Sequence, residues 1–348
     1  MTRTTVRRTT AVAVAAVLGT GSAQAQEITL KLHHFLSELT PSHTDMLVPW
    51  AEAVEENSDG RVEIEIYPSM SLGGKPPELI QQARDGVVDL IWTVNGYTPG
   101  LFPRTEVFEL PNVHRNDAGA TNLAMHEMFE EHLAQEYQGV EVMFLHVHAG
   151  NAIHMVDSPV RKPRDLAGAK LRTPSRTGAW VIEALGAAPA AMPVPELPQA
   201  LSKKVVDGAL IPFEIALPLK LQEQTDYQIE GADGWRVGNT TFQVSMNQAR
   251  WDELPEDIQQ AFRDASGPEW LTQTGEVWHA NDDTAIEVIV DSGNEHIELT
   301  PEEVAVFEAA LEPVVERWIE EVSAEGIDGT ALVETARGLI AEHSDGGS

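Results

Sequence analysis

The sequence predicts an α/β protein built from two lobes, and three observations support this prediction. Strand and helix patterns alternate from residue 27 to about residue 94, and the alternation resumes after residue 140. The segment from about Leu254 to the end reads as helical, with Gly and Pro interruptions. The roughly 320 residues after a removable N-terminal segment usually form two domains. We therefore expect two α/β lobes joined by crossing segments.

The expected elements follow from apolar spacing and from the residues at their ends. Strands alternate apolar and polar side chains, whereas helices repeat apolar residues every three or four positions and end near Gly or Pro. Strands are predicted at residues 27–35, 61–67, 87–93, 140–148, 150–158, 169–173, 205–211 and 241–247. Helices are predicted at residues 45–57, 76–86, about 117–137, 177–187 and 195–204.

The N-terminus has the layout of a secretory signal peptide. Three arginines precede an apolar run at residues 11–19, and Ala23-Gln24-Ala25 follows as a small-x-small cleavage site. The apolar run is too short to span a bilayer. We expect export by the general secretory route, cleavage after Ala25 and a mature chain that begins at Gln26.

Composition excludes several classes of partner and chemistry. The formal net charge is -32, and loss of the three signal-peptide arginines would make it -35. Nucleic acid and anionic membranes would repel such a chain. The sequence has no cysteine, so it can form neither disulfides nor thiolate nucleophiles. An anionic ligand would need a positive site to offset the acidic field.

The sequence carries no recognisable enzyme motif, and we predict no catalytic residue, cofactor or metal. His126 and His132 are six positions apart, whereas two zinc ligands on one helix face need a spacing of three or four. No G-x-S-x-G motif is present. A metal-binding carrier that uses His146, His148 and His154 stays open as an alternative, and so does an exported α/β enzyme.

Arg172 is the leading candidate for a binding residue. It ends the predicted strand 169–173, just before a Pro-Ser turn and a helix. In two-lobed α/β proteins, ligands sit at the carboxyl ends of strands, in the crevice between the lobes. A guanidinium presents paired donors that match a carboxylate. An exposed arginine at a strand end is the competing interpretation.

The chain resembles the substrate-binding subunits of TRAP transporters, of the DctP type, over essentially its whole mature length. The block from Lys170 to Pro212 carries the most specific part of the resemblance. Further matching segments are "SDGRVEIEIYPSMSLGG", "ARDGVVDLIW", "FPRTEVFELP" and "MNQARWDELPEDIQ". The resemblance implies a periplasmic, monomeric protein that closes on a small organic acid and delivers it to the subunits of a membrane permease. It also implies that Arg172 forms a salt bridge with the ligand carboxylate.

For the fold, the resemblance implies a two-lobed periplasmic-binding-protein fold with one long helix spanning both lobes, which matches the helical stretch from Leu254 to about Asn294. The expected boundaries are those of a signal peptide and two lobes that each receive a returning segment. Lobe I would comprise residues 26–150 and about 237–280, and lobe II residues 151–236 and about 281–348, after a signal peptide at 1–25.

The sequence departs from sialic-acid-binding members of the family at several polar positions. Those members have an asparagine where this chain has Ile211, and an aromatic side chain where it has Val194. Their second arginine has no counterpart near residues 152–154. The expected cleft is therefore less polar than a sugar acid requires. Its other candidate residues are Phe35, Trp92, Tyr97, Ile211, Phe213 and Trp235, with His34, His154 and Glu214 as polar groups.

Three ligand hypotheses follow. The first is a monocarboxylate with an apolar or aromatic body stacked on Tyr97 and Phe213. The second is a small hydroxy or keto acid that is hydrogen-bonded by His34 and His154. The third is an amine or zwitterion whose ammonium group is held by Glu214 and aromatic side chains.

Overall fold

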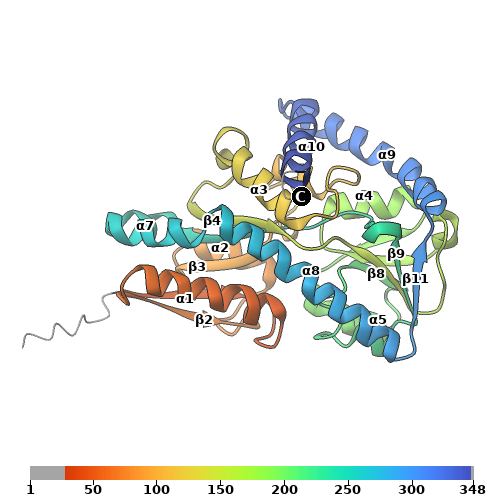
Figure 1. Ribbon diagram of the computed structural model, residues 1–348, viewed down its shortest axis with the longest axis horizontal. Coiled ribbons are helices and arrows are strands. Elements are labelled where there is room, and N and C mark those ends of the chain that lie inside the picture. The colour runs from red at the N-terminus through yellow and green to blue at the C-terminus, as the bar shows by residue number, and fades with distance from the viewer. Residues whose placement is uncertain (1–27, 346–348) are drawn as a thin grey trace, which may run out of the picture.

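The computed structural model describes residues 28–345 (Figure 1). The predicted signal peptide and the expected first mature residue, Gln26, lie outside the described residues. The α/β class is confirmed, since the chain forms two separate β-sheets with helices packed around them. No helix between residues 28 and 345 combines the length and apolar character needed to cross a lipid bilayer.

The first sheet has five strands in the order β2-β1-β3-β10-β4. Strand β1 pairs in parallel with β2 and β3, whereas β10 runs antiparallel to both β3 and β4. The strand bounds are β1 Ile28–His34, β2 Val62–Tyr67, β3 Leu90–Val94, β4 Val140–Val147 and β10 Thr241–Asn247. The late strand β10 thus enters the middle of a sheet that is otherwise built from the first half of the chain.

The second sheet has six strands in the order β11-β9-β5-β8-β6-β7. Strand β6 pairs in parallel with β7 and β8, and β5 runs antiparallel to β8 and β9. The strand bounds are β5 Ala152–Met155, β6 Lys170–Thr173, β7 Ala188–Ala191, β8 Gly208–Ile211, β9 Tyr227–Gly231 and β11 Glu295–Leu299. Three of these strands, β7, β9 and β11, were not among the elements expected from the sequence.

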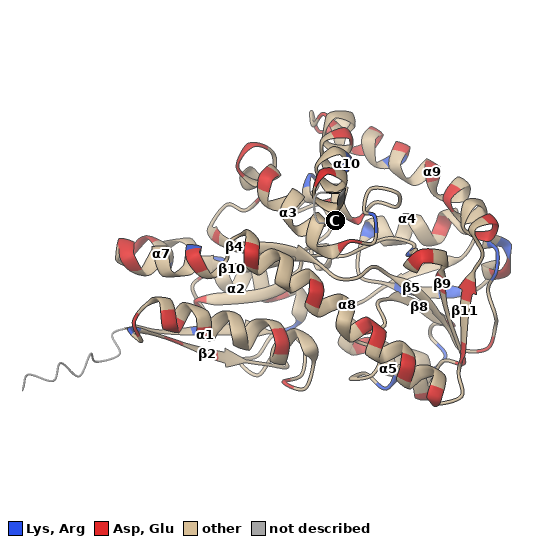
Figure 2. Cartoon of the chain, in the orientation of Figure 1, with Lys and Arg blue, Asp and Glu red and all other residues tan. Residues whose placement is uncertain are grey.

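The helices cover the outer faces of the sheets and connect their strands. Their bounds are α1 Val48–Asn57, α2 Leu79–Arg84, α3 Ala118–Met128, α4 Arg176–Ala184, α5 Leu197–Ser202, α6 Gln248–Asp252, α7 Glu256–Ala265, α8 Pro268–Asp291, α9 Pro301–Ala324 and α10 Gly329–Asp345. Acidic side chains outnumber basic ones on the outer helices (Figure 2), in keeping with the net charge of -32.

The long helix expected near residues 254–294 is divided into two, α7 and α8. Gly267 adopts an extended backbone and Pro268 starts the next helix, because proline cannot donate the hydrogen bond that would continue α7. Helix α8 packs on α3 and β4 beside the first sheet and continues to β11 in the second (Figure 1). One long helix therefore does connect the two sheets, although it is shorter than expected.

The expectation that the tail is helical throughout is wrong at β11. This strand pairs in parallel with β9, and its alternate residues Ile297 and Leu299 are buried. The last helix, α10, contacts α3 near the first sheet and also α9. The proposed lobe boundaries stay a prediction, because this tail touches elements of both halves.

Candidate ligand-binding site

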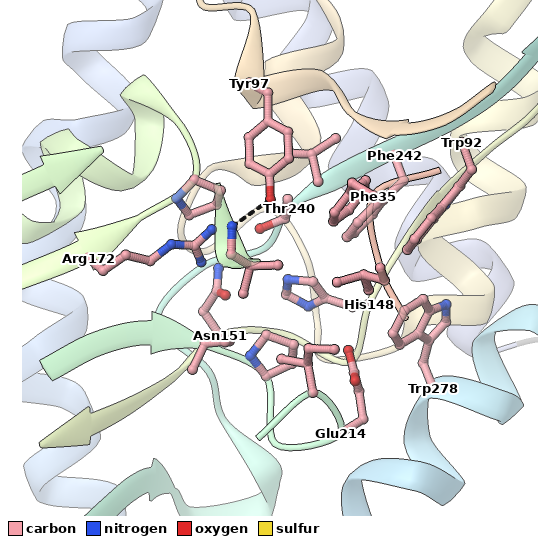
Figure 3. Close-up of a pocket in the computed structure, with 17 residues that line it drawn as sticks. Phe35, Trp92, Tyr97, His148, Asn151, Arg172, Glu214, Thr240, Phe242 and Trp278 are labelled. Atoms are coloured by element: carbon pink, nitrogen blue, oxygen red, sulfur yellow. Dashed lines mark hydrogen bonds between the residues drawn. The ribbon is translucent and has the colours of Figure 1, made fainter. Parts of the chain in front are cut away.

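A cavity lies where the two sheets face each other (Figure 3). Its residues come from the ends of β1, β3 and β10 on one side, from β6 and β8 on the other, and from α8. They are Phe35, Leu36, Trp92, Val94, Tyr97, His148, Asn151, Arg172, Pro174, Val194, Ile211, Pro212, Glu214, Ile215, Thr240, Phe242 and Trp278.

Arg172 lies near the end of β6 and points into this cavity (Figure 3). Only 3% of its surface is exposed, and its Nε donates a hydrogen bond to the Met192 carbonyl at 3.0 Å. The guanidinium also hydrogen-bonds to Tyr97, whose hydroxyl accepts a bond from the Val194 amide at 2.9 Å. Burial lowers the pKa of Arg172, but a guanidinium stays charged throughout the physiological range.

Within residues 28–345, Arg172 has no carboxylate partner. None of the salt bridges between described residues includes it, and Glu196 acts on it only through its electrostatic field. A buried positive charge without a counterion is strongly unfavourable. The cavity is therefore suited to an anion that pairs with Arg172.

The two sides of the cavity meet closely beside Tyr97. A Cβ atom at Gly96 would lie 2.4 Å from the Cβ of Ser175, which is too close for any side chain. Ser175 caps helix α4, since its hydroxyl accepts a hydrogen bond from the Gly178 amide at 3.2 Å. Glycine at position 96 thus allows the strand-end turn of the first sheet to contact the start of α4.

Stacked rings form the wall of the cavity on the side of the first sheet. Phe35 stacks on Trp92 with ring centroids 4.9 Å apart, and Trp92 stacks on Phe242 at 5.4 Å. Phe242 stacks in turn on His146 at 4.8 Å, and Trp92 Nε1 donates a hydrogen bond to His146 Nε2 at 2.9 Å. This wall is flat, apolar and fixed in place, as an aromatic ligand requires.

His148 supplies an uncharged donor to the same cavity. Its Nδ1 accepts a hydrogen bond from the Gly150 amide at 2.9 Å, so the ring proton resides on Nε2. Nε2 is buried and has no partner between residues 28 and 345. Burial holds the pKa of His148 well below its usual value, and nearby His114 adds to this effect. A neutral N–H group is therefore available to a ligand.

Glu214 lines the cavity away from Arg172 (Figure 3). Only 5% of its surface is exposed, and its backbone amide donates to Asp282 Oδ1 at 2.9 Å. Burial raises the pKa of the Glu214 carboxyl well above its usual value, and the charge of Asp282 raises it further. Both effects favour the protonated, neutral form of this carboxyl group.

The structure brings six of the ten predicted site residues to the cavity and places four elsewhere. Those at the cavity are Arg172, Phe35, Trp92, Tyr97, Ile211 and Glu214. Of the others, Phe213 packs between His154 and His296, and His34 hydrogen-bonds to His43 at 2.9 Å. Trp235 lies at a separate surface hollow and packs against Phe307.

Sequence reasoning missed several lining residues, among them Asn151, Thr240, Phe242 and Trp278. Thr240 and Phe242 reach the cavity because β10 inserts antiparallel beside β3, with Phe242 opposite Val94. Apolar alternation revealed the strand but not its neighbours. His148 was considered only as a metal ligand, yet residues 28–345 contain no group of three His, Cys, Asp or Glu side chains that could hold a metal ion.

Known proteins resemble the chain along nearly its whole length. The family model described as bacterial extracellular solute-binding protein, family 7 (DctP) matches residues 32–321. A TRAP solute-binding protein from Rhodoferax ferrireducens, solved with copurified benzoate, shares 36% identity at a TM-score of 0.89, over 92% of this chain and 99% of that one.

Two further relatives also match the chain over most of its length. A marine metagenome TRAP solute-binding protein specific for aromatic acid ligands, solved with 3-hydroxybenzoate, shares 36% identity at a TM-score of 0.88, over 92% of this chain and 99% of that one. The C4-dicarboxylate-binding periplasmic protein DctP of Rhodobacter capsulatus is 28% identical over 88% of this chain and 90% of its own length. These relatives are binding proteins for transport. The chain belongs to the DctP family, the substrate-binding subunits of TRAP transporters.

Proposed function

We propose that the chain is a periplasmic TRAP subunit that captures a monocarboxylate with an aromatic or apolar body. The ligand would lie between the two sheets with its carboxylate on Arg172, and a membrane permease would receive it. The observation that carries this proposal is the guanidinium of Arg172, which is 97% buried and has no carboxylate partner between residues 28 and 345. A ligand carboxylate would supply the missing charge.

The walls of the cavity favour an aromatic body for the ligand. The flat stack of Phe35, Trp92 and Phe242 offers apolar surface, and Ile211 and Val194 add to the apolar lining. Burying a single aromatic ring against such walls contributes about 2 kcal/mol. The structural relatives solved with benzoate and 3-hydroxybenzoate have ligands of this kind.

The positive charge of Arg172 also explains how an acidic protein can bind an anion. The surface is strongly negative, so it repels a carboxylate in solution. Inside the closed cavity, water is excluded, and an arginine–carboxylate pair is much stronger than at the surface. We therefore expect binding to shift the protein toward the closed arrangement of its two sheets.

A ligand screen followed by one substitution tests this function. The mature protein is heated with benzoate, aliphatic acids, hydroxy acids, amino acids, sugar acids and small amines, and ligands that raise the Tm are measured by calorimetry. We expect aromatic monocarboxylates to give the largest shifts. Arg172→Lys should weaken benzoate binding by about 2–4 kcal/mol, because an ammonium cannot reproduce paired guanidinium bonds.

The outer surface provides a control for this substitution. Arg317 pairs with Glu183 at 2.8 Å, and both side chains are about half exposed, so Arg317→Lys should leave the affinity unchanged. If Arg172→Lys also binds benzoate as tightly as the wild type, the carboxylate is not held by Arg172. Shifts produced only by amines would point instead to an ammonium bound at Glu214.

A further inference from the structure

The carboxyl group of Glu214 is a second polar group in the cavity, and it does not pair with Arg172. It follows strand β8 and enters the cavity beside His148 and Trp278 (Figure 3). Although Arg172 and Glu214 line one cavity, they form no salt bridge with each other. None of the side-chain hydrogen bonds between residues 28 and 345 involves the Glu214 carboxyl group, and only its backbone amide donates, to Asp282. One wall of the cavity therefore holds an acid whose bonding capacity is unused.

The nearest charged groups prevent Glu214 from acting as an ordinary anion. Asp282 accepts the Glu214 backbone amide through Oδ1, and its other oxygen accepts a bond from Arg236 Nη2 at 2.9 Å. Arg236 also binds Glu230. The one nearby guanidinium is thus shared between two other carboxylates. No cation pairs with Glu214 among the described residues, which favours its protonated form, and a protonated carboxyl can both donate and accept hydrogen bonds.

With Glu214 protonated, the charge in the cavity is concentrated at Arg172. Arg172 provides the only formal charge among its lining residues when Glu214 is protonated, and His148 is neutral with a free Nε2–H group. In Figure 3, His148 lies between Arg172 and Glu214, and the stacked rings form a wall to one side of these polar groups. A ligand with one carboxylate and one uncharged polar substituent satisfies both ends, whereas a second charge at the Glu214 end would be left without a partner of opposite sign.

We propose that Glu214 is a specificity-determining residue, which hydrogen-bonds as a neutral acid to a hydroxyl group on the ligand's ring. The chain would then select hydroxylated aromatic monocarboxylates over the unsubstituted acid, over dicarboxylates and over acids with an ammonium group. This inference rests on the proposed function, since it places the ligand carboxylate at Arg172. Sites built to hydrogen-bond a substrate hydroxyl discriminate strongly against analogues that lack it, because the buried polar group is then left unpaired.

A set of matched ligands tests the inference by isothermal titration calorimetry. The probes are benzoate, 3-hydroxybenzoate, 4-hydroxybenzoate, isophthalate and 3-(aminomethyl)benzoate, each titrated into the wild type, Glu214→Leu and Glu214→Gln. We expect at least one hydroxybenzoate to bind the wild type about tenfold or more tightly than benzoate does. Glu214→Leu should abolish that preference, and Glu214→Gln should keep much of it because an amide can also donate and accept.

Proton exchange gives a second readout. Titrations in two buffers with different ionisation enthalpies should show no proton release when a hydroxybenzoate binds, because Glu214 stays protonated. Tighter binding of 3-(aminomethyl)benzoate, with release of about one proton, would instead assign Glu214 to an ammonium ligand and overturn the inference. Glu223→Leu is the matched control: this glutamate lies at the surface, outside the cavity, so the preference should persist.

The outcomes separate this inference from the proposed function. If no aromatic acid binds any variant, both proposals fail. If benzoate binds but the wild type shows no hydroxyl preference, or if Glu214→Leu retains the preference, only the role of Glu214 fails. Thermal unfolding of each variant without ligand checks that the fold is retained.

Discussion

Arg172 and Arg236 are both almost completely buried, yet their surroundings differ in one respect. Arg236 is 6% exposed; it donates to Asp282 at 2.9 Å and to the Gly234 carbonyl at 3.0 Å, and it forms a second ion pair with Glu230. Arg172 is 3% exposed and has no carboxylate partner among residues 28–345. We infer that a buried arginine with carboxylate partners stabilises the fold, whereas the charge of one without them is available to a ligand, as proposed for Arg172.

The electrostatics of the carboxylates near Arg236 agree with this comparison. Burial acts to raise the pKa of Glu230, but the hydrogen bond and charge of His296, together with Arg236, outweigh it and lower that pKa. His296 Nε2 lies 2.7 Å from Glu230. Glu214, which no cation contacts, shows the opposite direction, with a raised pKa. The charged groups around Arg236 therefore pair with one another, whereas Arg172 and Glu214 in the cavity have no partner of opposite charge among the described residues.

The largest expected effect is the loss of stability in Arg236→Met. The substitution leaves Asp282 buried without its cation, so the free energy of unfolding should fall by about 3–5 kcal/mol. Urea unfolding of the ligand-free protein, followed by tryptophan fluorescence, measures this change. A loss below about 1 kcal/mol, as expected for the exposed pair of Arg317, would contradict the structural role assigned to Arg236.

Arg172→Met should produce the reverse combination. The ligand-free protein should keep its free energy of unfolding within about 1 kcal/mol, since an apolar side chain replaces an unpaired buried charge, which offsets the loss of the hydrogen bonds to the Met192 carbonyl and to Tyr97. Affinity for benzoate should nevertheless fall by about 2–4 kcal/mol, or roughly 30- to 1,000-fold. Urea unfolding and calorimetry give the two values. Destabilisation comparable to that of Arg236→Met would erase the difference between the two arginines.

The sequence was sufficient to predict the strands and helices that carry their own apolar pattern. Strand β3 consists of buried residues that are apolar except for Thr93, and helix α4 has a Ser cap and a Gly just beyond its end. Strand β7, with the sequence Ala-Pro-Ala-Ala, has no such pattern and exists because it pairs with β6. Strand β11 was likewise missed, since its short alternation lies between two long helices.

A site residue could be predicted from the sequence where its position on its own strand determines whether it reaches the cavity. Arg172, at the end of a parallel strand, is such a case. Phe213 illustrates the limit: it adjoins two lining residues, Pro212 and Glu214, but the turn after β8 directs its ring toward His154 instead. Phe242 shows the converse, since its position depends on where β10 inserts in the sheet.

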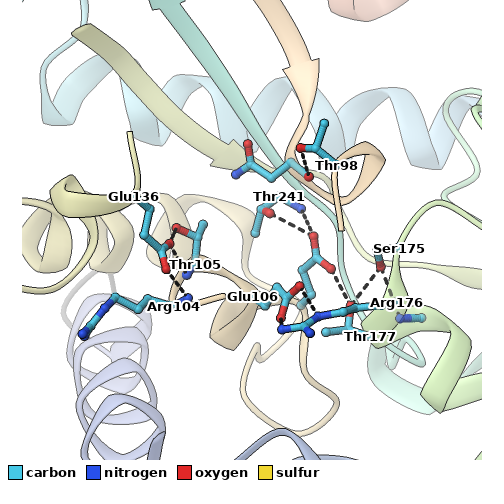
Figure 4. A network of polar contacts seen from close by, with 12 residues as sticks. Thr98, Arg104, Thr105, Glu106, Glu136, Ser175, Arg176, Thr177 and Thr241 are labelled. Atoms are coloured by element: carbon cyan, nitrogen blue, oxygen red, sulfur yellow. Dashed lines mark hydrogen bonds and ion pairs between the residues drawn. The ribbon is translucent and has the colours of Figure 1, made fainter. Parts of the chain in front are cut away.

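A third arginine, Arg176, differs from both because its carboxylate partner, Glu106, belongs to the other half of the molecule. Its Nε and Nη2 donate to the two oxygens of Glu106, each at 2.7 Å (Figure 4), and Glu106 raises the pKa of Arg176. This pair joins the start of α4 to the segment Thr105–Glu109 beside the first sheet. Arg176→Met should therefore destabilise the closed arrangement and weaken benzoate binding about tenfold.

The matched control for Arg176→Met is Arg317→Met. Both guanidinium groups pack over the ring of Trp180, at 5.3 Å and 4.5 Å, but the partner of Arg317 is Glu183 on the same side of the molecule. Calorimetry should show an unchanged affinity for Arg317→Met. Equal losses in both variants would mean that contact with Trp180, rather than the contact between halves, supports binding.

The last expected effect concerns the acid in the cavity and appears as a pH dependence. Because the pKa of Glu214 is raised by burial and by Asp282, the folded protein keeps a proton that the unfolded chain loses above its ordinary pKa. Unfolding then releases a proton, so this residue makes the ligand-free protein less stable as the pH rises above about 4.5, by at most about 1.4 kcal/mol per pH unit.

Glu214→Gln removes that dependence. Urea midpoints at pH 4, 6 and 8 should be nearly equal for the two proteins at pH 4 and should increasingly favour the variant above it. If the wild type instead gains stability relative to Glu214→Gln as the pH rises, Glu214 is ionised beside a cation. Glu214 would then resemble the paired Glu230, and the difference between the two carboxylates would disappear.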